Sequence, residues 1–599
     1  MQKRLTRAEV PVEMTWDLTR IFPNAEAWEA AMAAVEGEIG SVTRFKGKLG
    51  EGASTFLACL EAQEELHKRF IPVASYASLH LSADGTSSAY QASAARVGAL
   101  SAKVQAATSF IQTEALALPG GTLERYLAEE PGLTDFRRTI ELLLEQKPHV
   151  LGPETEVALA SLSEVLGAPQ MIYNRSKSSD MTFDPITDKD GIQWPMSFAV
   201  YEGRFEKDPD PVLRRNAYAS FTKGLRAYKN TFAATWATEV KKNVVVARLR
   251  GYKSATDMIL AEQEVTEDVY NGLHDIILKE LAPHMRRYVE LRKRVLGLDK
   301  ILYCDIEAPL DPEYNPETTY EQASETILRG ISVLGPEYAP IIDEGLRSRW
   351  IDLADNIGKS TGAFCSTVYG VHPYILITWT GSMRDALVLA HELGHAGQGV
   401  LALRYQRLAN TRGSRFFSEA PSTINELLVA QDILDRSADR RMRRWVIMQL
   451  LATYYHNFVR HLIEGELQRR TYVLAEKGRP LTEAVLSKVQ GEILEEFWGG
   501  VVEIDDGARL TWMRQPHYYM GLYPYTYSAG LTIGTAVAQA IREEGRPAVD
   551  RWLEVLKIAG TKKPLERAAM AGVDMTRPDA IRKAVAFVGS LIDEVVEGF

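Results

Sequence analysis

The residues whose types and spacing best suit chemistry are His391, Glu392 and His395, in the segment His-Glu-Leu-Gly-His. Because side chains four residues apart share one face of an α-helix, His391 and His395 can offer ring nitrogens to one metal ion. Glu392 is rotated by about 100° from His391 around the helix. Its carboxylate can therefore take a proton from a metal-bound water without being a ligand itself. The spacing predicts a metal site with an adjacent general base.

Chance occurrence is the alternative to this interpretation. In a chain of 599 residues the pattern arises by chance on the order of one time in fifty. The flanking sequence, however, predicts the helix that the site needs. Ser382 with Asp385 three residues later is typical of a capping box, and the apolar segment 386–390 leads into the motif. We therefore expect a helix over about residues 382–403.

A catalytic metal site needs a third protein ligand and an open position. Two downstream glutamates, Glu419 and Glu426, are candidates. Pro421 favours the first turn of a helix, so Glu419 would lie near a helix N-terminus, where the dipole also stabilises a carboxylate that binds no metal. Glu426, two turns on, could accept the second ring N–H of a ligating histidine. A third histidine of the H-E-x-x-H-x-x-G-x-x-H type is excluded, since the sequence has Gln398 and Leu401 there.

A tyrosine-rich segment follows much later in the chain. It begins at His517 and contains Tyr523, Tyr525 and Tyr527, together with glycine and proline residues that allow it to bend. Tyrosine hydroxyls and a histidine N–H can donate hydrogen bonds to an oxyanion as a tetrahedral intermediate forms. Alternating aromatic residues are equally typical of a packed strand or loop, and the pattern alone favours packing.

Composition restricts the class of protein. With 46% hydrophobic and 25% charged residues the chain is typical of a soluble globular protein of two or more domains. A net charge of -10 argues against nucleic acid as the main partner. The cysteines Cys59, Cys304 and Cys365 form no paired motif, which indicates a reducing compartment, and none is an expected ligand. No signal peptide or membrane span is apparent, so we expect a cytoplasmic protein without a membrane partner.

Hydrophobic periodicity predicts a mostly helical chain. A short hairpin is expected around residues 181–194, and a boundary near residue 200 separates an N-terminal helical domain (1–200) from a domain (201–599) that contains the predicted catalytic metal site. Two segments before the metal helix, 362–369 and 373–379, are rich in β-branched and aromatic residues and are expected to be strands. We expect an extended peptide to pair with the strand at 373–379. A purely structural sheet is the alternative.

The motif together with several further blocks resembles the M3 family of zinc oligopeptidases, and most closely its oligoendopeptidase F branch. The resemblance spans nearly the whole chain. It rests on the segments 391–395, 418–422 and 517–527, on Trp16-Asp17-Leu18, Gly251-Tyr252-Lys253-Ser254-Ala255 and Trp350-Ile351-Asp352-Leu353 with Lys359, and on Pro373-Tyr374. Gln398 stands where many relatives have another histidine, which we interpret as variation in substrate contacts.

This resemblance implies one Zn²⁺ per chain, bound by His391, His395 and Glu419, with Glu392 as the general base that activates the zinc-bound water. It implies oxyanion or substrate contacts from the histidine and tyrosines of the later segment, namely His517, Tyr523, Tyr525 and Tyr527. The implied fold is a mainly α, two-lobed zincin that encloses a deep channel, with a small β-sheet beside the metal helix. The implied function is hydrolysis of internal bonds in short, unstructured peptides.

Two other functions remain open at this stage. A general neutral endopeptidase would cut long or folded chains. A helical binding protein could use zinc structurally, but such a site has no use for a base next to a ligand, so Glu392 argues against it.

Overall fold

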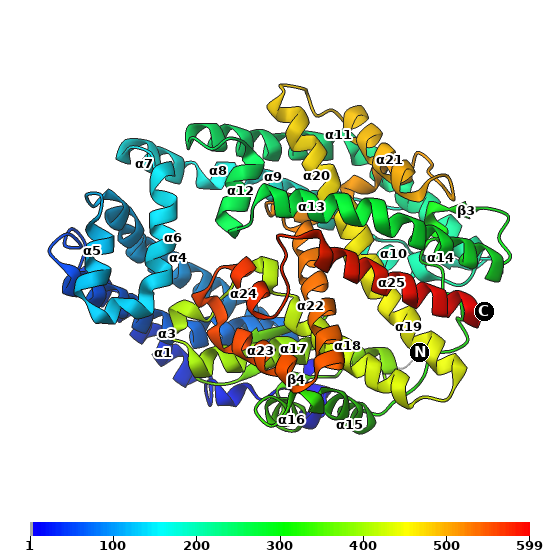
Figure 1. Cartoon of the computed structure of the whole chain (residues 1–599), viewed down its shortest axis with the longest axis horizontal. Helices are drawn as coiled ribbons and strands as arrows, with labels where there is room; N and C mark the ends of the chain where they lie inside the picture. The colour runs from blue at the N-terminus through cyan, green and yellow to red at the C-terminus, as the bar shows by residue number, and fades with distance from the viewer. Residues whose placement is uncertain (1–3) are drawn as a thin grey trace.

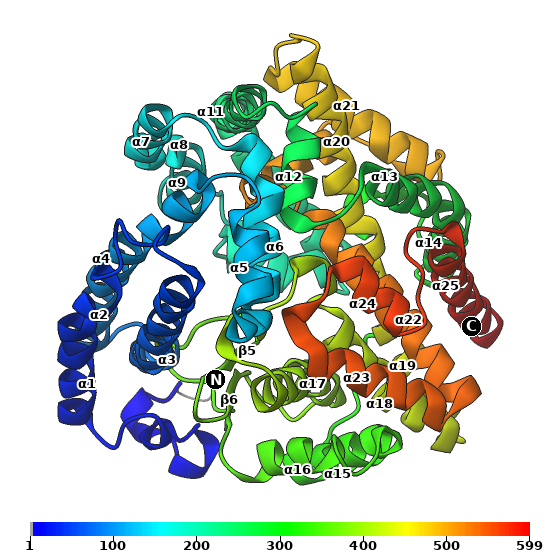
Figure 2. The same ribbon diagram turned by 60° about the vertical axis from the view of Figure 1, so that its left-hand side comes forward.

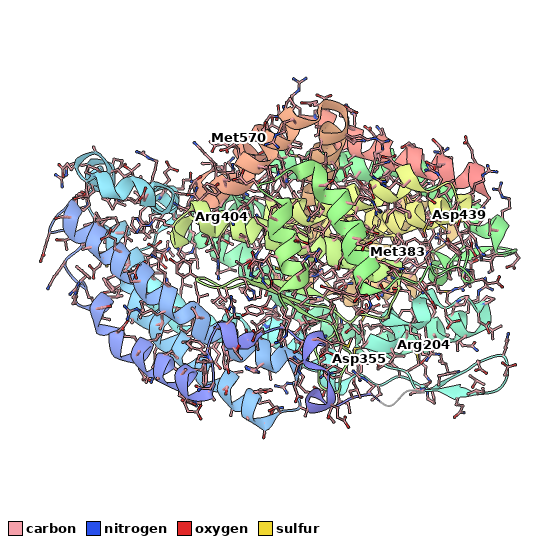
Figure 3. All side chains as sticks on the ribbon, turned by 90° about the horizontal axis from the view of Figure 1, so that it is seen from below. Arg204, Asp355, Met383, Arg404, Asp439 and Met570 are labelled. Carbon is pink, nitrogen blue, oxygen red and sulfur yellow. The ribbon has the colours of Figure 1, made fainter. Side chains whose placement is uncertain are left out.

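The helix that carries the histidines, α17 (Met383–Tyr405), lies inside a helical scaffold in the computed structural model (Figure 1). The structure describes residues 4–599. The predicted capping box is present: Ser382 Oγ accepts a hydrogen bond from the Asp385 amide at 3.3 Å, and the Asp385 carboxylate accepts one from the Ser382 amide at 3.2 Å. Met383 and Arg404, labelled in Figure 3, lie near the two ends of the helix.

The N-terminal helices form a layer with its own apolar core; α1 to α4 lie at the left of Figure 2, and α5 and α6 lie nearer its centre. Buried residues from Trp28 to Leu143 make up that core. The helices are α1 (Ala25–Glu38), α2 (Gly40–Thr43), α3 (Ala53–Ala83), α4 (Ser88–Ala117), α5 (Thr122–Glu129) and α6 (Arg137–Gln146).

A second and larger core extends through the rest of the chain, from Tyr173 to Val595. The expected hairpin is present, with Ile186 paired to Trp194. A domain boundary at residue 200 remains a prediction. The elements before α17 are α7 (Pro153–Ser161), α8 (Ser163–Leu166), α9 (Ala168–Arg175), β1 (Ile186–Thr187), β2 (Gln193–Trp194), α10 (Phe198–Gly203), α11 (Pro211–Leu249), α12 (Ala255–Gln263), α13 (Glu267–Ile276), α14 (Ala282–Val295), β3 (Ile301–Leu302), α15 (Tyr320–Ile331), α16 (Ala339–Arg347), β4 (Ile351–Asp352), β5 (Phe364–Thr367) and β6 (Pro373–Leu376).

The C-terminal helices pack around α17 and complete the scaffold. Within residues 4–599, none of the helices has the length and apolar character that crossing a membrane requires. The elements after α17 are α18 (Ala420–Arg436), α19 (Arg440–Tyr454), α20 (His461–Glu476), α21 (Glu483–Trp498), β7 (Val502–Glu503), α22 (Pro524–Glu544), α23 (Arg546–Ile558), α24 (Pro564–Met570) and α25 (Pro578–Gly598).

A three-stranded sheet of order β4-β6-β5 lies beside α17. Strand β6 is parallel to β4 and antiparallel to β5, with Ile375 opposite both Ile351 and Cys365. Beyond β6 the amides of Ile377 and Trp379 donate to carbonyls of the β4 segment at 3.1 and 2.8 Å. The expectation that a peptide pairs with 373–379 is therefore wrong for residues 373–376, because β6 is already paired along both edges. Ile377 and Trp379 are paired on the β4 side. The strands at the two edges of the sheet are β4 and β5.

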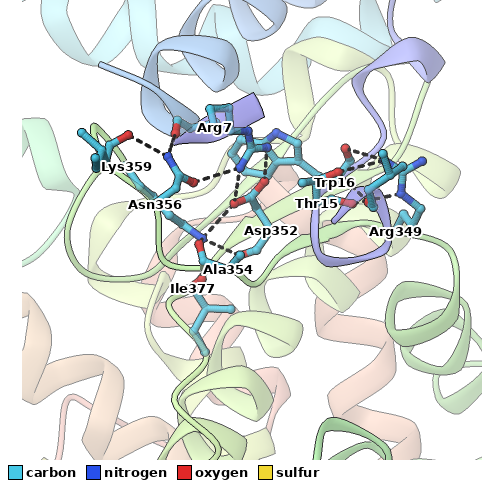
Figure 4. Close-up of polar contacts among 12 residues, drawn as sticks. Arg7, Thr15, Trp16, Arg349, Asp352, Ala354, Asn356, Lys359 and Ile377 are labelled. Atoms are coloured by element: carbon cyan, nitrogen blue, oxygen red, sulfur yellow. Dashed lines mark hydrogen bonds and ion pairs between the residues drawn. The ribbon is translucent and has the colours of Figure 1, made fainter. Parts of the chain in front are cut away.

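A buried ion cluster ties the N-terminal segment to this sheet (Figure 4). Asp352, fully buried in β4, contacts Lys359 Nζ at 2.8 Å and forms an ion pair with Arg7. Lys359 Nζ also donates to the carbonyls of Asp352, Ala354 and Ile377 at 2.8–3.0 Å. Because every N–H of the ammonium has a buried acceptor, the cluster fixes how the loop after β4 covers the sheet.

Asp352→Ala should destabilise the protein by about 3–5 kcal/mol, because it leaves the Lys359 ammonium buried without a carboxylate. Asp355→Ala is the matched control. Asp355 pairs with Arg4 at 2.7 Å, but both side chains are about half exposed, so its loss should cost under about 1 kcal/mol. Urea unfolding of the two variants measures both values, and equal costs would contradict a structural role for the cluster.

Candidate metal centre

Two helices bring the three candidate ligands together. His391 and His395 lie on one face of α17, and Glu419 is the residue that caps the N-terminus of α18, with Pro421 in the first turn as expected. The Nε2 atoms of both histidines lie 3.5 Å from the same oxygen, Glu419 Oε2. The three candidate ligand atoms all lie within 4.8 Å of one another. This group could hold a metal ion.

Glu426 has a different position. Its Oε2 lies 3.3 Å from His391 Nδ1, and its Oε1 accepts a hydrogen bond from Thr453 Oγ1 at 2.8 Å. A carboxylate at Nδ1 fixes the tautomer and leaves Nε2 free to face Glu419. The structure thus separates the two glutamates that the sequence left as alternatives: Glu419 faces both histidines, and Glu426 orients one of them.

The environment gives the nearby carboxylates different proton affinities. Burial alone would raise the pKa of Glu419, but hydrogen bonds and charge from His391 and His395 hold it well below its usual value. Burial raises the pKa of Glu392, which is 6% exposed. Within residues 4–599 the Glu392 carboxylate has no hydrogen-bond partner.

A cavity of about 510 Å³ opens beside these residues. It is lined by Glu392, His395 and Gln398 from α17 and by Phe364, Cys365 and Thr367 from the edge strand β5. The loop between α17 and α18 forms another part of its wall. A peptide paired with β5 would therefore lie next to Glu392.

His517, Tyr523 and Tyr527 form an aromatic group close to the candidate metal centre. The ring centroids of Tyr523 and Tyr527 lie 5.1 Å apart, and that of His517 lies 5.4 and 5.6 Å from them. Burial raises the pKa of Tyr527, and the charges of Tyr523, Glu419 and Glu464 add to this effect. Tyr527 is therefore near the third candidate ligand.

The structure does not bring Tyr525 to this aromatic group. Its hydroxyl donates to Gln263 Oε1 at 2.6 Å, and its ring packs edge-on against Tyr270 at 5.0 Å. Only 1% of the residue is exposed. Tyr525 therefore fixes the start of α22 in the core.

Sequence reasoning missed a buried histidine–glutamate network behind His517. Glu464 Oε2 lies 2.7 Å from His461 Nδ1 and 3.7 Å from His517 Nδ1. His461 Nε2 lies 2.9 Å from His456 Nε2, and the His461 ring stacks on Tyr527 at 4.3 Å. The one sequence signal for this network is the three-residue spacing of His461 and Glu464, which puts the two side chains on the same face of a helix.

Comparison with known proteins places the chain in a family. Residues 204–587 match the model of peptidase family M3, and residues 114–183 match that of oligopeptidase F. Oligopeptidase PepF of Bacillus subtilis is 33% identical over 99% of this chain and 88% of its own length. Group B oligopeptidase PepB of Streptococcus agalactiae is 28% identical over 96% of both.

Solved structures agree with these matches. Oligoendopeptidase F of Enterococcus faecium superposes with a TM-score of 0.75 at 27% identity, covering 96% of this chain and 99% of its own. A Chlamydophila abortus crystal structure reaches a TM-score of 0.89 at 25% identity over the whole of both chains. The predicted family, the mainly α zincin fold and the peptidase class are confirmed. The chain belongs to peptidase family M3 and is a metallopeptidase of the oligopeptidase F type.

Proposed function

We propose that this protein is a zinc-dependent oligoendopeptidase that cuts internal bonds of short, unstructured peptides. Zinc is bound by His391, His395 and Glu419, and Glu392 is the general base. The convergence of two imidazole nitrogens on one Glu419 oxygen carries the proposal. Two nitrogens and one carboxylate oxygen are a common donor set of catalytic zinc sites.

The residues around the centre divide the chemistry between them. Zinc bound there would polarise the scissile carbonyl and lower the pKa of the attacking water. The unpaired Glu392 carboxylate takes the proton of that water and passes it to the leaving amine. Glu426 holds His391 in the tautomer that presents Nε2. His517, Tyr523 and Tyr527 donate hydrogen bonds to the oxyanion as it develops.

The surrounding cavities support a restriction to unstructured peptides. The 510 Å³ cavity shares Arg412, Gly413 and Ser414 with a second cavity of about 1060 Å³. Residues of α6, α8, α11 and α12 line that second cavity. A peptide on β5 is extended, with its backbone hydrogen bonds made to the strand. A folded protein would first have to unfold, at a cost of about 5–15 kcal/mol.

Glu392→Gln should retain zinc but lose at least about 100-fold in kcat, because it removes the base and not a ligand. His391→Ala, His395→Ala and Glu419→Ala should each lose zinc as well. Glu426→Gln is the control: it should retain zinc with an affinity lower by about 10- to 100-fold. Metal analysis and peptide hydrolysis are measured on each variant. Substantial activity in zinc-loaded Glu392→Gln, or zinc retained by Glu419→Ala, would refute this assignment.

Tyr523→Phe or Tyr527→Phe should lower kcat by roughly 100- to 1000-fold with little change in KM, because an oxyanion donor acts in the transition state. His517→Ala should behave in the same way. Tyr525→Phe serves as the matched control, since it removes the hydrogen bond to Gln263 and should change thermal stability rather than kcat. If neither Tyr523→Phe nor Tyr527→Phe alters kcat, the aromatic group has only a packing role.

The enzyme should cut peptides up to a length limit and leave native globular proteins intact, since only an unfolded chain can pair with β5 beside Glu392. A peptide ladder, casein and a folded protein are incubated in parallel with the zinc-loaded enzyme, and the products are identified by mass spectrometry. Efficient cutting of intact casein would favour an open-cleft endopeptidase instead.

A further inference from the structure

Arg567, in α24, is a buried charge with no partner. It is 1% exposed, and its three guanidinium nitrogens have no hydrogen-bond partner in the described part of the chain. The guanidinium carbon lies 4.1 Å from the centroid of the Phe417 ring. Burial lowers the pKa of Arg567 to about 10, so the group is still charged at neutral pH. Buried charges in proteins are normally paired, so this one calls for an anion.

Its position connects this charge to the proposed active site. Arg567 lines the same 510 Å³ cavity as Glu392 and His395. Gly413 covers the guanidinium so closely that a Cβ atom on Gly413 would lie 2.3 Å from Arg567 Nη1. Because Gly413 has no side chain, the Arg567 guanidinium can lie directly beneath the backbone of the cavity wall.

A second unpaired arginine precedes that glycine. Arg412 is exposed and lines both the 510 Å³ and the 1060 Å³ cavity. From residue 4 to the C-terminus, no carboxylate forms an ion pair with Arg412 or Arg567, and the Arg412 side chain makes no hydrogen bond. Both arginines therefore bring positive charge to the 510 Å³ cavity without an ion-pair partner among the described residues.

We propose that Arg412 and Arg567 form a subsite that binds a carboxylate of the peptide substrate. Arg412 contacts the carboxylate through its guanidinium, which can donate two parallel hydrogen bonds. Arg567 adds its charge through the Gly413 backbone, where the interior screens it less than water does. The subsite rests on the proposed function, since it requires a peptide in the cavity.

A carboxylate held at this wall fixes the register of the peptide relative to Glu392. A peptide offers two sources of carboxylate, its C-terminus and its Asp or Glu side chains. In either case the bound carboxylate determines which internal bond lies beside the metal centre.

The test measures binding to zinc-loaded, full-length Glu392→Gln protein, so that the peptide is not consumed. One fluorescent peptide is made in four forms: unmodified, amidated at its C-terminus, with its acidic side chains replaced by amides, and with both changes. We expect one of the two single changes to weaken binding by about 10- to 100-fold. The form that loses affinity identifies the source of the carboxylate.

Substitutions then assign the loss to the two arginines. Arg412→Gln should weaken binding of the unmodified peptide to the level of the fully neutral one and abolish discrimination between them. Arg567→Met should reduce this discrimination while thermal stability is unchanged or raised, because a buried unpaired charge is replaced by an apolar side chain. Arg567→Lys retains the charge and should retain discrimination. Arg404→Gln, which removes an exposed arginine of α17, is the matched control and should have no effect.

Other results would overturn the subsite. One such result is that all four peptide forms bind with affinities within twofold of one another. Another is that Arg412→Gln protein still binds the unmodified peptide more tightly than the neutral one. If the wild-type enzyme still cuts the neutral peptide in either case, the proposed function stands although the subsite is refuted. If no peptide form binds or is cut, the proposed function fails together with the subsite. Cleavage positions provide a second readout, because Arg412→Gln should allow cutting at additional bonds.

Discussion

Close packing of three helices around Glu419 is the constraint on which the candidate metal centre depends. A Cβ atom at Gly394 of α17 would lie 2.5 Å from the Pro421 carbonyl oxygen of α18. One at Gly530 of α22 would lie 2.8 Å from Glu419 Cβ. Because both positions lack side chains, α18 can begin between the two helices, and Glu419 reaches both histidines. The ligand geometry is thus set by the packing of rigid elements rather than by a loop.

Three glutamates near the candidate metal centre differ in role because their immediate surroundings differ. Glu419 lies between two imidazoles, which lower its pKa, whereas burial without a partner raises the pKa of Glu392. Glu426 is held by Thr453 and His391. Groups of one chemical type whose environments push their pKa values apart are typical of sites that perform acid–base chemistry. This difference, rather than the motif alone, supports Glu392 as the proton carrier.

Features set by local sequence were predictable, and those set by distant contacts were not. The capping box at Ser382 and the four-residue spacing of the histidines predicted the helix and its face. Strand composition predicts a strand at 373–379, but nothing local shows that β6 lies between β4 and β5, so composition alone indicates the wrong strand for peptide binding. Similarly, residue type could not distinguish Tyr525 from Tyr523 and Tyr527. The contact of Glu464 with His517 joins residues far apart in the chain and needed the fold.

Anomalous diffraction at the zinc absorption edge, on crystals of the zinc-loaded wild-type protein, tests the central claim most directly. The account predicts one strong peak at about 2.0–2.2 Å from Nε2 of His391, Nε2 of His395 and an oxygen of Glu419, with the Glu392 carboxylate outside ligand distance. A second cluster, His461, Glu464 and His517, also brings three candidate ligand atoms within 4.8 Å of one another. A peak at that cluster alone, or a metal bound through Glu392 in place of Glu419, would contradict the account.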